Sequence, residues 1–171
     1  MQEKQERLHE LIEQLRKYID RPEIGLPEEI FLLATEITPM VNVDLLIKDK
    51  EGRILLSWRK DKFYEEGWHV PGGILRLKET FEKRIREVGE IEIGCTNIKY
   101  NPIPIEIVPI ICPEMKQRGH FVSFVFECQL PKDFEIVNNV SEYEAGFLKW
   151  HDVYPNNMLK VHEFYKKYWS E

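Results

Sequence analysis

The stretch Trp68-His69-Val70-Pro71-Gly72-Gly73 is followed by ILRLKETFEKRIREVGEIEIG over residues 74–94, and the two together decide how the chain folds. Pro-Gly-Gly after a short apolar strand predicts a tight turn at which the backbone can approach a ligand closely. Phe81, Ile85 and Val88 form an apolar stripe at helical spacing. We therefore predict a strand, a glycine turn and a helix over about residues 79–92.

Three carboxylates, Glu87, Glu90 and Glu92, lie near the end of this helix. If the helix continues regularly, Glu92 falls four residues after Val88 on the inward-facing row, where a carboxylate is costly unless it is paired or bound to a metal. Mg²⁺ prefers oxygen ligands, and one or two carboxylates with substrate phosphates often complete its shell. The residues thus indicate a cation site, or alternatively a solvated helix face.

Strands are predicted on both sides of this helix. Residues 41–49 and 53–59 flank the turn Asp49-Lys50-Glu51-Gly52 and predict a hairpin. The segment IPIEIVPIIC (103–112) alternates, but its prolines predict an edge or bulged strand. The segment HFVSFVFECQL (120–130) is apolar on nearly both faces and predicts a central strand. Together these elements predict a compact α/β domain with a mixed sheet.

Further helices are predicted at both ends of the chain. Residues 4–19 carry leucine and isoleucine at helical spacing among charged residues, which predicts an amphipathic helix. Its apolar stripe covers either a partner in a dimer or the chain's own domain. A second helix is expected to start near Pro27 and to end before Pro39, and another to close the chain near residues 156–169.

Composition places the chain among soluble globular proteins. Of 171 residues, 43% are hydrophobic and 32% charged, and the net charge is −6. An acidic surplus argues against nucleic-acid polymers and membrane surfaces as partners. The N-terminus is too polar for a signal peptide, and no apolar run is long enough to span a membrane. The chain has three cysteines, Cys95, Cys112 and Cys128, and no two of them form a CxxC motif. We interpret them as free thiols and therefore expect a cytoplasmic protein.

The segment around Gly73 resembles the Nudix box, G-x5-E-x7-R-E-U-x-E-E-x-G-U with U aliphatic, of hydrolases that cleave nucleoside diphosphates linked to another group. Without a gap, Gly73, Glu79 and Gly94 fall at the box spacing, and Glu92 falls on the second Glu of its E-E pair. The preceding W-x-x-P-G-G is also typical of the family. The resemblance covers roughly residues 39–152.

This resemblance implies a Nudix-type α/β/α sandwich with a mixed sheet in a Nudix hydrolase domain over residues 39–171, preceded by an N-terminal helical extension over residues 1–38. It also implies Mg²⁺ (or Mn²⁺) as cofactor, a small nucleotide-linked substrate and a homodimer. The N-terminal helix is a candidate part of that dimer.

The box is degenerate. In the gapless alignment Glu87 replaces the box arginine, while Val88 and Ile91 replace two of its glutamates. A slip of one residue restores part of the R-E-U-x-E pattern around Glu87 and Glu90 but loses the second Glu of the pair. We therefore expect Glu92 and the Gly73 carbonyl to bind the metal, and retain Glu90 as a further ligand and Glu87 as a ligand or catalytic group.

A box of this kind is similar to that of the GDP-mannose mannosyl hydrolase branch, which breaks the sugar C–O bond. In that branch an arginine neutralises the leaving group and a histidine activates water, and Arg59 and His120 match these two by position. The arginine that this branch places after Gly-Gly is Ile74 here, and Arg76 lies two residues away. Arg76 and Arg118 are retained as further candidate substrate-binding residues, although Arg118 also reads as a solvated loop residue.

Three functions follow from these readings. The first is Mg²⁺-dependent hydrolysis of a nucleoside diphosphate sugar or related compound, with C–O cleavage as in the mannosyl hydrolase branch. The second is ordinary P–O cleavage by a Nudix pyrophosphohydrolase. The third is a Nudix-fold nucleotide-binding or regulatory module that has lost activity together with its box carboxylates.

Overall fold

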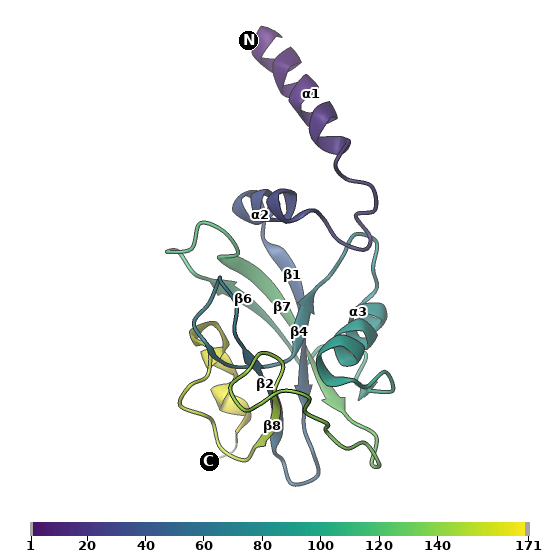
Figure 1. Cartoon of the computed structure of the whole chain (residues 1–171), viewed down its shortest axis with the longest axis vertical. Coiled ribbons are helices and arrows are strands. Elements are labelled where there is room, and N and C mark those ends of the chain that lie inside the picture. Colours follow the sequence, from purple (N-terminus) through teal and green to yellow (C-terminus); the bar gives the residue numbers. More distant parts are fainter. Residues whose placement is uncertain (1, 170–171) are drawn as a thin grey trace.

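A computed structural model describes residues 2–169. The elements follow one another along the chain in this order: α1 (Gln2–Arg16), α2 (Glu28–Ile37), β1 (Met40–Ile47), β2 (Ile54–Arg59), β3 (Gly67–His69), β4 (Gly72–Ile74), α3 (Phe81–Val88), the π-helical turn η1 (Gly89–Ile93), β5 (Lys99–Tyr100), β6 (Glu106–Ile111), β7 (His120–Gln129), β8 (Leu148–His151) and the 3₁₀ helix η2 (Lys160–Tyr168). Figure 1 shows these elements gathered into one body from which α1 projects.

The larger sheet is mixed, as the sequence predicts. Strand β7 pairs in parallel with β1 and antiparallel with β5 and β6, while β4 pairs antiparallel with the other edge of β1. The prediction that residues 120–130 form a central strand is confirmed. Strand β6 pairs with β7 along one edge, and Pro109, which has no N–H to donate, lies within it.

The hairpin prediction is wrong for the strands, although the turn forms. Gly52 adopts φ 79° and its N–H donates to the Asp49 carbonyl. Beyond the single bridge between Lys48 and Ile54, the two strands separate, because both edges of β1 are already occupied by β4 and β7. Strand β2 instead lies at the centre of a second sheet in the order β3-β2-β8.

Two apolar clusters hold the layers together. Helix α3 buries Ile85 and Val88 against one face of the larger sheet, which confirms the predicted stripe. On the other side, the second sheet and the C-terminal region bury Trp58, Trp68 and Tyr165. The closing segment is helical as predicted, but as the 3₁₀ helix η2 rather than an α-helix.

The helix after the glycine turn changes its geometry at Gly89. The Thr80 side chain caps α3 by accepting a hydrogen bond from the Lys83 N–H at 3.2 Å. A Cβ on Gly89 would come within 2.4 Å of the Cys95 carbonyl, so only glycine permits this close approach. The π-helical turn follows directly and ends at Gly94, which adopts φ 76°. π-Helical turns of this kind occur often at functional sites.

The N-terminal region forms two helices, as predicted. Helix α2 ends before Pro39, whereas α1 buries none of its residues. The apolar stripe of α1 is exposed: Leu8, Leu11, Ile12 and Leu15. No helix within residues 2–169 is long and apolar enough to cross a membrane.

Candidate active site

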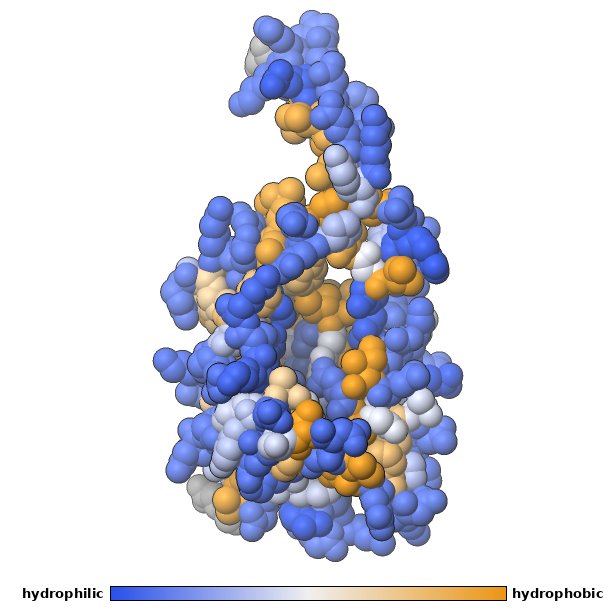
Figure 2. Space-filling model, viewed as in Figure 1, coloured by the Kyte–Doolittle hydropathy of each residue, from blue (hydrophilic) through white to orange (hydrophobic). Residues whose placement is uncertain are grey.

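A cleft of about 1040 Å³ lies between the two sheets, the glycine segment and the N-terminal extension. Figure 2 shows this face of the molecule hollowed below α2. Most of the predicted site residues line it: Arg59, Gly73, Arg76, Glu87, Glu92 and Arg118. Leu26, Glu28 and Phe31 also line it, so the N-terminal extension forms part of its wall.

The two glycines of the turn lie where other residues would clash. A Cβ on Gly73 would meet the Val88 side chain at 2.9 Å, and one on Gly72 would meet Asp44 Oδ1 at 2.3 Å. The glycines therefore let β4 pack directly against both helix α3 and strand β1. This close packing brings the Gly73 backbone to the same cleft as Glu87 and Glu92.

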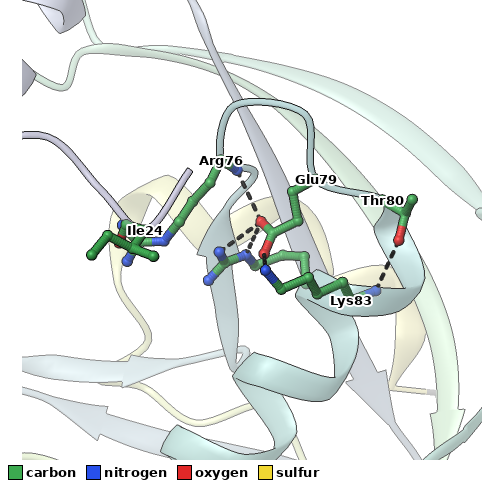
Figure 3. Close-up of polar contacts among 6 residues, drawn as sticks. Ile24, Arg76, Glu79, Thr80 and Lys83 are labelled. Carbon is green, nitrogen blue, oxygen red and sulfur yellow. Dashed lines mark hydrogen bonds and ion pairs between the residues drawn. The ribbon is translucent and has the colours of Figure 1, made fainter. Parts of the chain in front are cut away.

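Glu79 has a positioning role beside this turn rather than a place in the cleft lining. Its Oε2 accepts hydrogen bonds from the Arg76 backbone N–H at 2.9 Å and from Arg84 Nε and a terminal Arg84 nitrogen at 2.8 and 2.6 Å. Figure 3 shows Glu79 among Arg76, Thr80 and Lys83. Burial raises the pKa of Glu79, but the hydrogen bonds from Arg76 and Arg84 outweigh it, so the pKa is lowered overall.

The three predicted metal-binding carboxylates do not all lie in the cleft. Glu92 and Glu87 line the cleft, whereas Glu90 is exposed and lies outside the cleft lining. Glu92 Oε2 is 3.5 Å from His69 Nε2, and this oxygen is buried without a hydrogen-bond partner. Within residues 2–169, no three His, Cys, Asp or Glu side chains form a group that could hold a metal ion. A cation here would need ligands from the backbone, water or substrate.

Two arginines lie against aromatic rings at another part of the cleft. The Arg59 guanidinium lies 4.5 Å from the Tyr64 ring centre and pairs with Asp61 at 2.5 Å. The Arg118 guanidinium lies 4.7 Å from the Phe63 ring centre. Burial and the neighbouring Arg59 lower the pKa of Arg118. The structure of residues 2–169 pairs no carboxylate with Arg118, and its Nε is buried without a partner. The reading of Arg118 as a solvated loop residue does not fit this position.

The loop that carries Arg118 is held by helix α2. The Arg118 N–H donates to Thr35 Oγ1 at 3.0 Å, and the Arg118 carbonyl accepts from the Tyr64 hydroxyl at 2.9 Å. Arg118 has φ 56°, a conformation that a non-glycine residue adopts only when its surroundings fix it. Next to it, Gln117 donates to Glu36 at 2.8 Å. The N-terminal extension thus orients one of the cleft arginines.

Arg76 is exposed at the rim and contacts the same extension. Its guanidinium donates to the Ile24 carbonyl, beside Gly25, where an added Cβ would clash with it (Figure 3). Arg76 therefore ties the segment before α2 to the loop after the glycine turn.

His120 is not brought to the cleft. Phe121 and Ser123 line it, and because side chains alternate along a strand, His120 at the start of β7 points to the opposite face. The described cleft lining therefore contains neither His120 nor Glu90, and the geometry gives no support to their predicted roles.

A buried polar group at the cleft was missed by the sequence analysis. Asp44 accepts hydrogen bonds from the Tyr165 hydroxyl at 2.6 Å and from Asn42 Nδ2 at 2.5 Å. Burial raises the pKa of Asp44 to about 6, against the lowering effect of hydrogen bonds from Tyr165 and Ser123. An Asp within the apolar run VNVDLLI was the available signal. Its partner Tyr165 lies 121 residues away and carries no such signal.

His162 completes this group. It is buried, and its Nδ1 accepts a hydrogen bond from the Val70 N–H at 3.1 Å, which assigns the ring proton of a neutral imidazole to Nε2. Burial, with His69 and Arg59 nearby, lowers the pKa of His162 well below its usual value.

The structure is that of an α/β protein in which a helix covers a mixed sheet, and carboxylates and arginines line one cleft beside a glycine turn. The chain belongs to the Nudix family of hydrolases, because the NUDIX domain model matches residues 38–168. The α/β fold expected from the resemblance is thereby confirmed.

The chain is also similar to a curated protein over part of its length. The chain is 32% identical over 79 residues to the low-salt glycan biosynthesis protein Agl8 of Haloferax volcanii, a match covering 46% of this chain and 50% of that protein. The chain thus spans about half the length of this curated relative.

Solved structures share the fold. A MutT Nudix hydrolase from Burkholderia pseudomallei superposes with a TM-score of 0.60 at 22% identity, covering 78% of this chain and 99% of that one. A UDP-X diphosphatase gives a TM-score of 0.56 at 20% identity and covers 96% of this chain and 76% of that one. The second likeness therefore extends into the N-terminal helices.

Proposed function

We propose that the protein is a divalent-cation-dependent hydrolase of a nucleoside diphosphate sugar or a related nucleoside diphosphate compound. The observation that carries this proposal is the Arg118 guanidinium, held in the cleft against Phe63 without a carboxylate partner in the described structure. A fixed guanidinium with no carboxylate paired to it is suited to bind a phosphate oxygen. Arg59 lines the same cleft, where its guanidinium is paired with Asp61.

The residues also fit a cation. Glu92 has a buried, unpartnered carboxylate oxygen, and Glu87 and Gly73 line the same cleft. We propose Glu92, Glu87 and Gly73 as the groups that would hold Mg²⁺ or Mn²⁺. A bound cation would neutralise charge on the diphosphate. Since so few carboxylates are available, substrate phosphates and water would complete its coordination shell.

Two bonds could be broken. Departure of a nucleoside diphosphate from a sugar carbon (C–O cleavage) needs charge stabilisation on phosphate and one base, and a site with few carboxylates favours it. P–O cleavage is the alternative, and the name of the structurally similar UDP-X diphosphatase favours it. The name of Agl8 supports a substrate from glycan metabolism. The cleft lining does not include the predicted base, His120, so we propose that a group lining the cleft takes that role in either reaction.

Hydrolysis in ¹⁸O-labelled water separates these reactions. A panel of nucleoside diphosphate sugars would be incubated with the protein and Mg²⁺ or Mn²⁺. Label in the free sugar means C–O cleavage, whereas label in a nucleoside monophosphate or sugar phosphate means P–O cleavage. Binding of the same compounds without hydrolysis would instead support the inactive binding module. Glu92→Gln should reduce turnover strongly, and His120→Ala should leave it nearly unchanged.

We further propose a cytoplasmic homodimer. The exposed apolar stripe of α1 offers a surface for a second copy, and Cys95, Cys112 and Cys128 are free thiols, as expected in a reducing compartment. Light scattering on the full chain and on a Leu11→Glu variant tests the dimer: the parent should have twice the mass of the variant.

A further inference from the structure

We propose that His69 is a nitrogen ligand of the bound cation, acting together with Glu92, and that the site consequently prefers Mn²⁺, Co²⁺ or Zn²⁺ over Mg²⁺. This inference rests on the proposed function only in that the same cleft binds a cation. It assigns a ligand that the Nudix box does not contain, because His69 precedes the Pro-Gly-Gly turn.

The two side chains are placed as ligands of one ion would be. His69 Nε2 and Glu92 Oε2 lie 3.5 Å apart, and both side chains are largely buried, with 14% and 25% of their surface exposed. Donors bound to one tetrahedral transition-metal ion at about 2.0–2.2 Å lie about 3.3–3.6 Å from each other. The separation therefore matches a shared ion.

Hydrogen bonding leaves this pair unsatisfied. Glu92 Oε2 and His69 Nδ1 are both buried, and neither has a hydrogen-bond partner within the described part of the chain. Buried polar atoms of native proteins almost always have partners, and an unpaired one calls for an absent water or ion. A cation bound to Glu92 Oε2 and His69 Nε2 would satisfy the carboxylate directly.

Neighbouring polar groups are already engaged. His162 Nδ1 accepts from the Val70 N–H, and its ring centre is 6.0 Å from that of His69. The Asp44 carboxylate accepts from Asn42 on one oxygen and from Tyr165 on the other. Neither residue offers the free donor atom that His69 and Glu92 present.

The strand positions His69 firmly. It is the last residue of β3 and is paired with Ser57 of β2 in the second sheet. Glu92 lies in the π-helical turn, after the helix that packs on Gly73, and lines the same cleft. The donor pair thus bridges a sheet and a helix that share no other ion pair in residues 2–169.

The donor types set the expected metal preference. Mg²⁺ is a hard ion that prefers oxygen and is bound mainly by carboxylates. Imidazole nitrogen favours Zn²⁺ and other transition metals, whose affinities for such sites rise from Mn²⁺ through Co²⁺ to Cu²⁺ and fall again at Zn²⁺. Val88 and Ile91 replace two box carboxylates, so Glu92 and Glu87 with the His69 imidazole supply less negative charge than a complete box would. This deficit weakens the binding of Mg²⁺ most.

Calorimetric titration with the metal alone tests this inference without substrate. Parent protein should bind Mn²⁺ at least about tenfold more tightly than Mg²⁺, and His69→Phe should lose about tenfold or more of the Mn²⁺ affinity. His120→Phe is the matched control and should bind as the parent does. Equal loss in both variants, or no loss in His69→Phe, would overturn the assignment.

Pulsed electron paramagnetic resonance on the Mn²⁺-loaded parent gives a second readout that needs no variant to fold. Coupling to one directly bound imidazole nitrogen is expected, and its absence would exclude His69 as a ligand. A positive result with no hydrolysis of any substrate would retain this inference and reject the proposed function. Hydrolysis with Mg²⁺ but no nitrogen coupling would retain the proposed function and reject His69 as a metal ligand.

Discussion

Glu79 and Arg84 form a buried ion pair in which one carboxylate oxygen, Oε2, accepts hydrogen bonds from two guanidinium nitrogens at 2.8 and 2.6 Å. The gapless alignment puts Glu87 where the box has an arginine, and Arg84 lies three residues earlier on the same helix. The pair ties the loop after Gly73 to helix α3.

Substitution Glu79→Gln should destabilise the fold by about 3 kcal/mol, because it leaves the Arg84 charge buried without a partner. Urea denaturation measures this. The matched control is Glu82→Gln, which breaks the exposed pair with Arg86 and should cost less than about 0.5 kcal/mol. Equal losses in the two variants would contradict a structural role for Glu79.

Substitution Arg118→Met should raise the KM for a nucleoside diphosphate sugar by about ten- to a hundredfold, as expected for the loss of a charge-assisted hydrogen bond to phosphate. Initial-rate kinetics check this against Arg86→Met, which removes an exposed arginine on α3 and should leave KM unchanged. An unchanged KM in Arg118→Met would place the phosphates elsewhere.

Thr35 acts on the cleft through Arg118, because its hydroxyl oxygen accepts the Arg118 N–H at 3.0 Å. Thr35→Val should therefore raise KM by about fivefold, the value of one hydrogen bond, with little change in kcat. Thr38→Val, at the exposed end of the same helix, is the control. A lower kcat at constant KM would show that α2 does not act by holding Arg118.

The stability of the fold should carry a contribution from Asp44 that falls as pH rises. Burial raises the pKa of Asp44 to about 6 from 3.8, so the folded state holds the proton more tightly than the unfolded chain does. The contribution is present below about pH 4 and is lost between pH 4 and 6, by about 3 kcal/mol. Urea unfolding of Asp44→Asn should show a difference from the parent that grows in favour of the variant over this window; a constant difference would contradict the assignment.

The spacing of apolar residues in the sequence correctly predicted individual helices and strands. The stripe of Phe81, Ile85 and Val88 predicts α3, and the apolar run after His120 predicts the central strand β7. The second sheet could not be predicted, because a turn at Gly52 fits both a hairpin and a chain that crosses to another layer.

The site was predictable only in part for the same reason. The box alignment indicates Gly73 and Glu92, which carry its spacing. His69 contacts Glu92, and Arg118 is held by Thr35; both partners are distant in sequence. His120 lies outside the cleft lining because side chains alternate along β7. Such relationships arise only when the strands pair.

The central claim is cation-dependent hydrolysis in this one cleft, and ³¹P NMR tests it most directly. A panel of nucleoside diphosphate sugars would be followed with Mn²⁺ for the parent, Glu92→Gln and Arg118→Met. We predict that the parent converts at least one compound, that a chelator stops the reaction, and that both variants are strongly impaired. Absence of conversion across the panel, or conversion at the parent rate by both variants, would contradict the account.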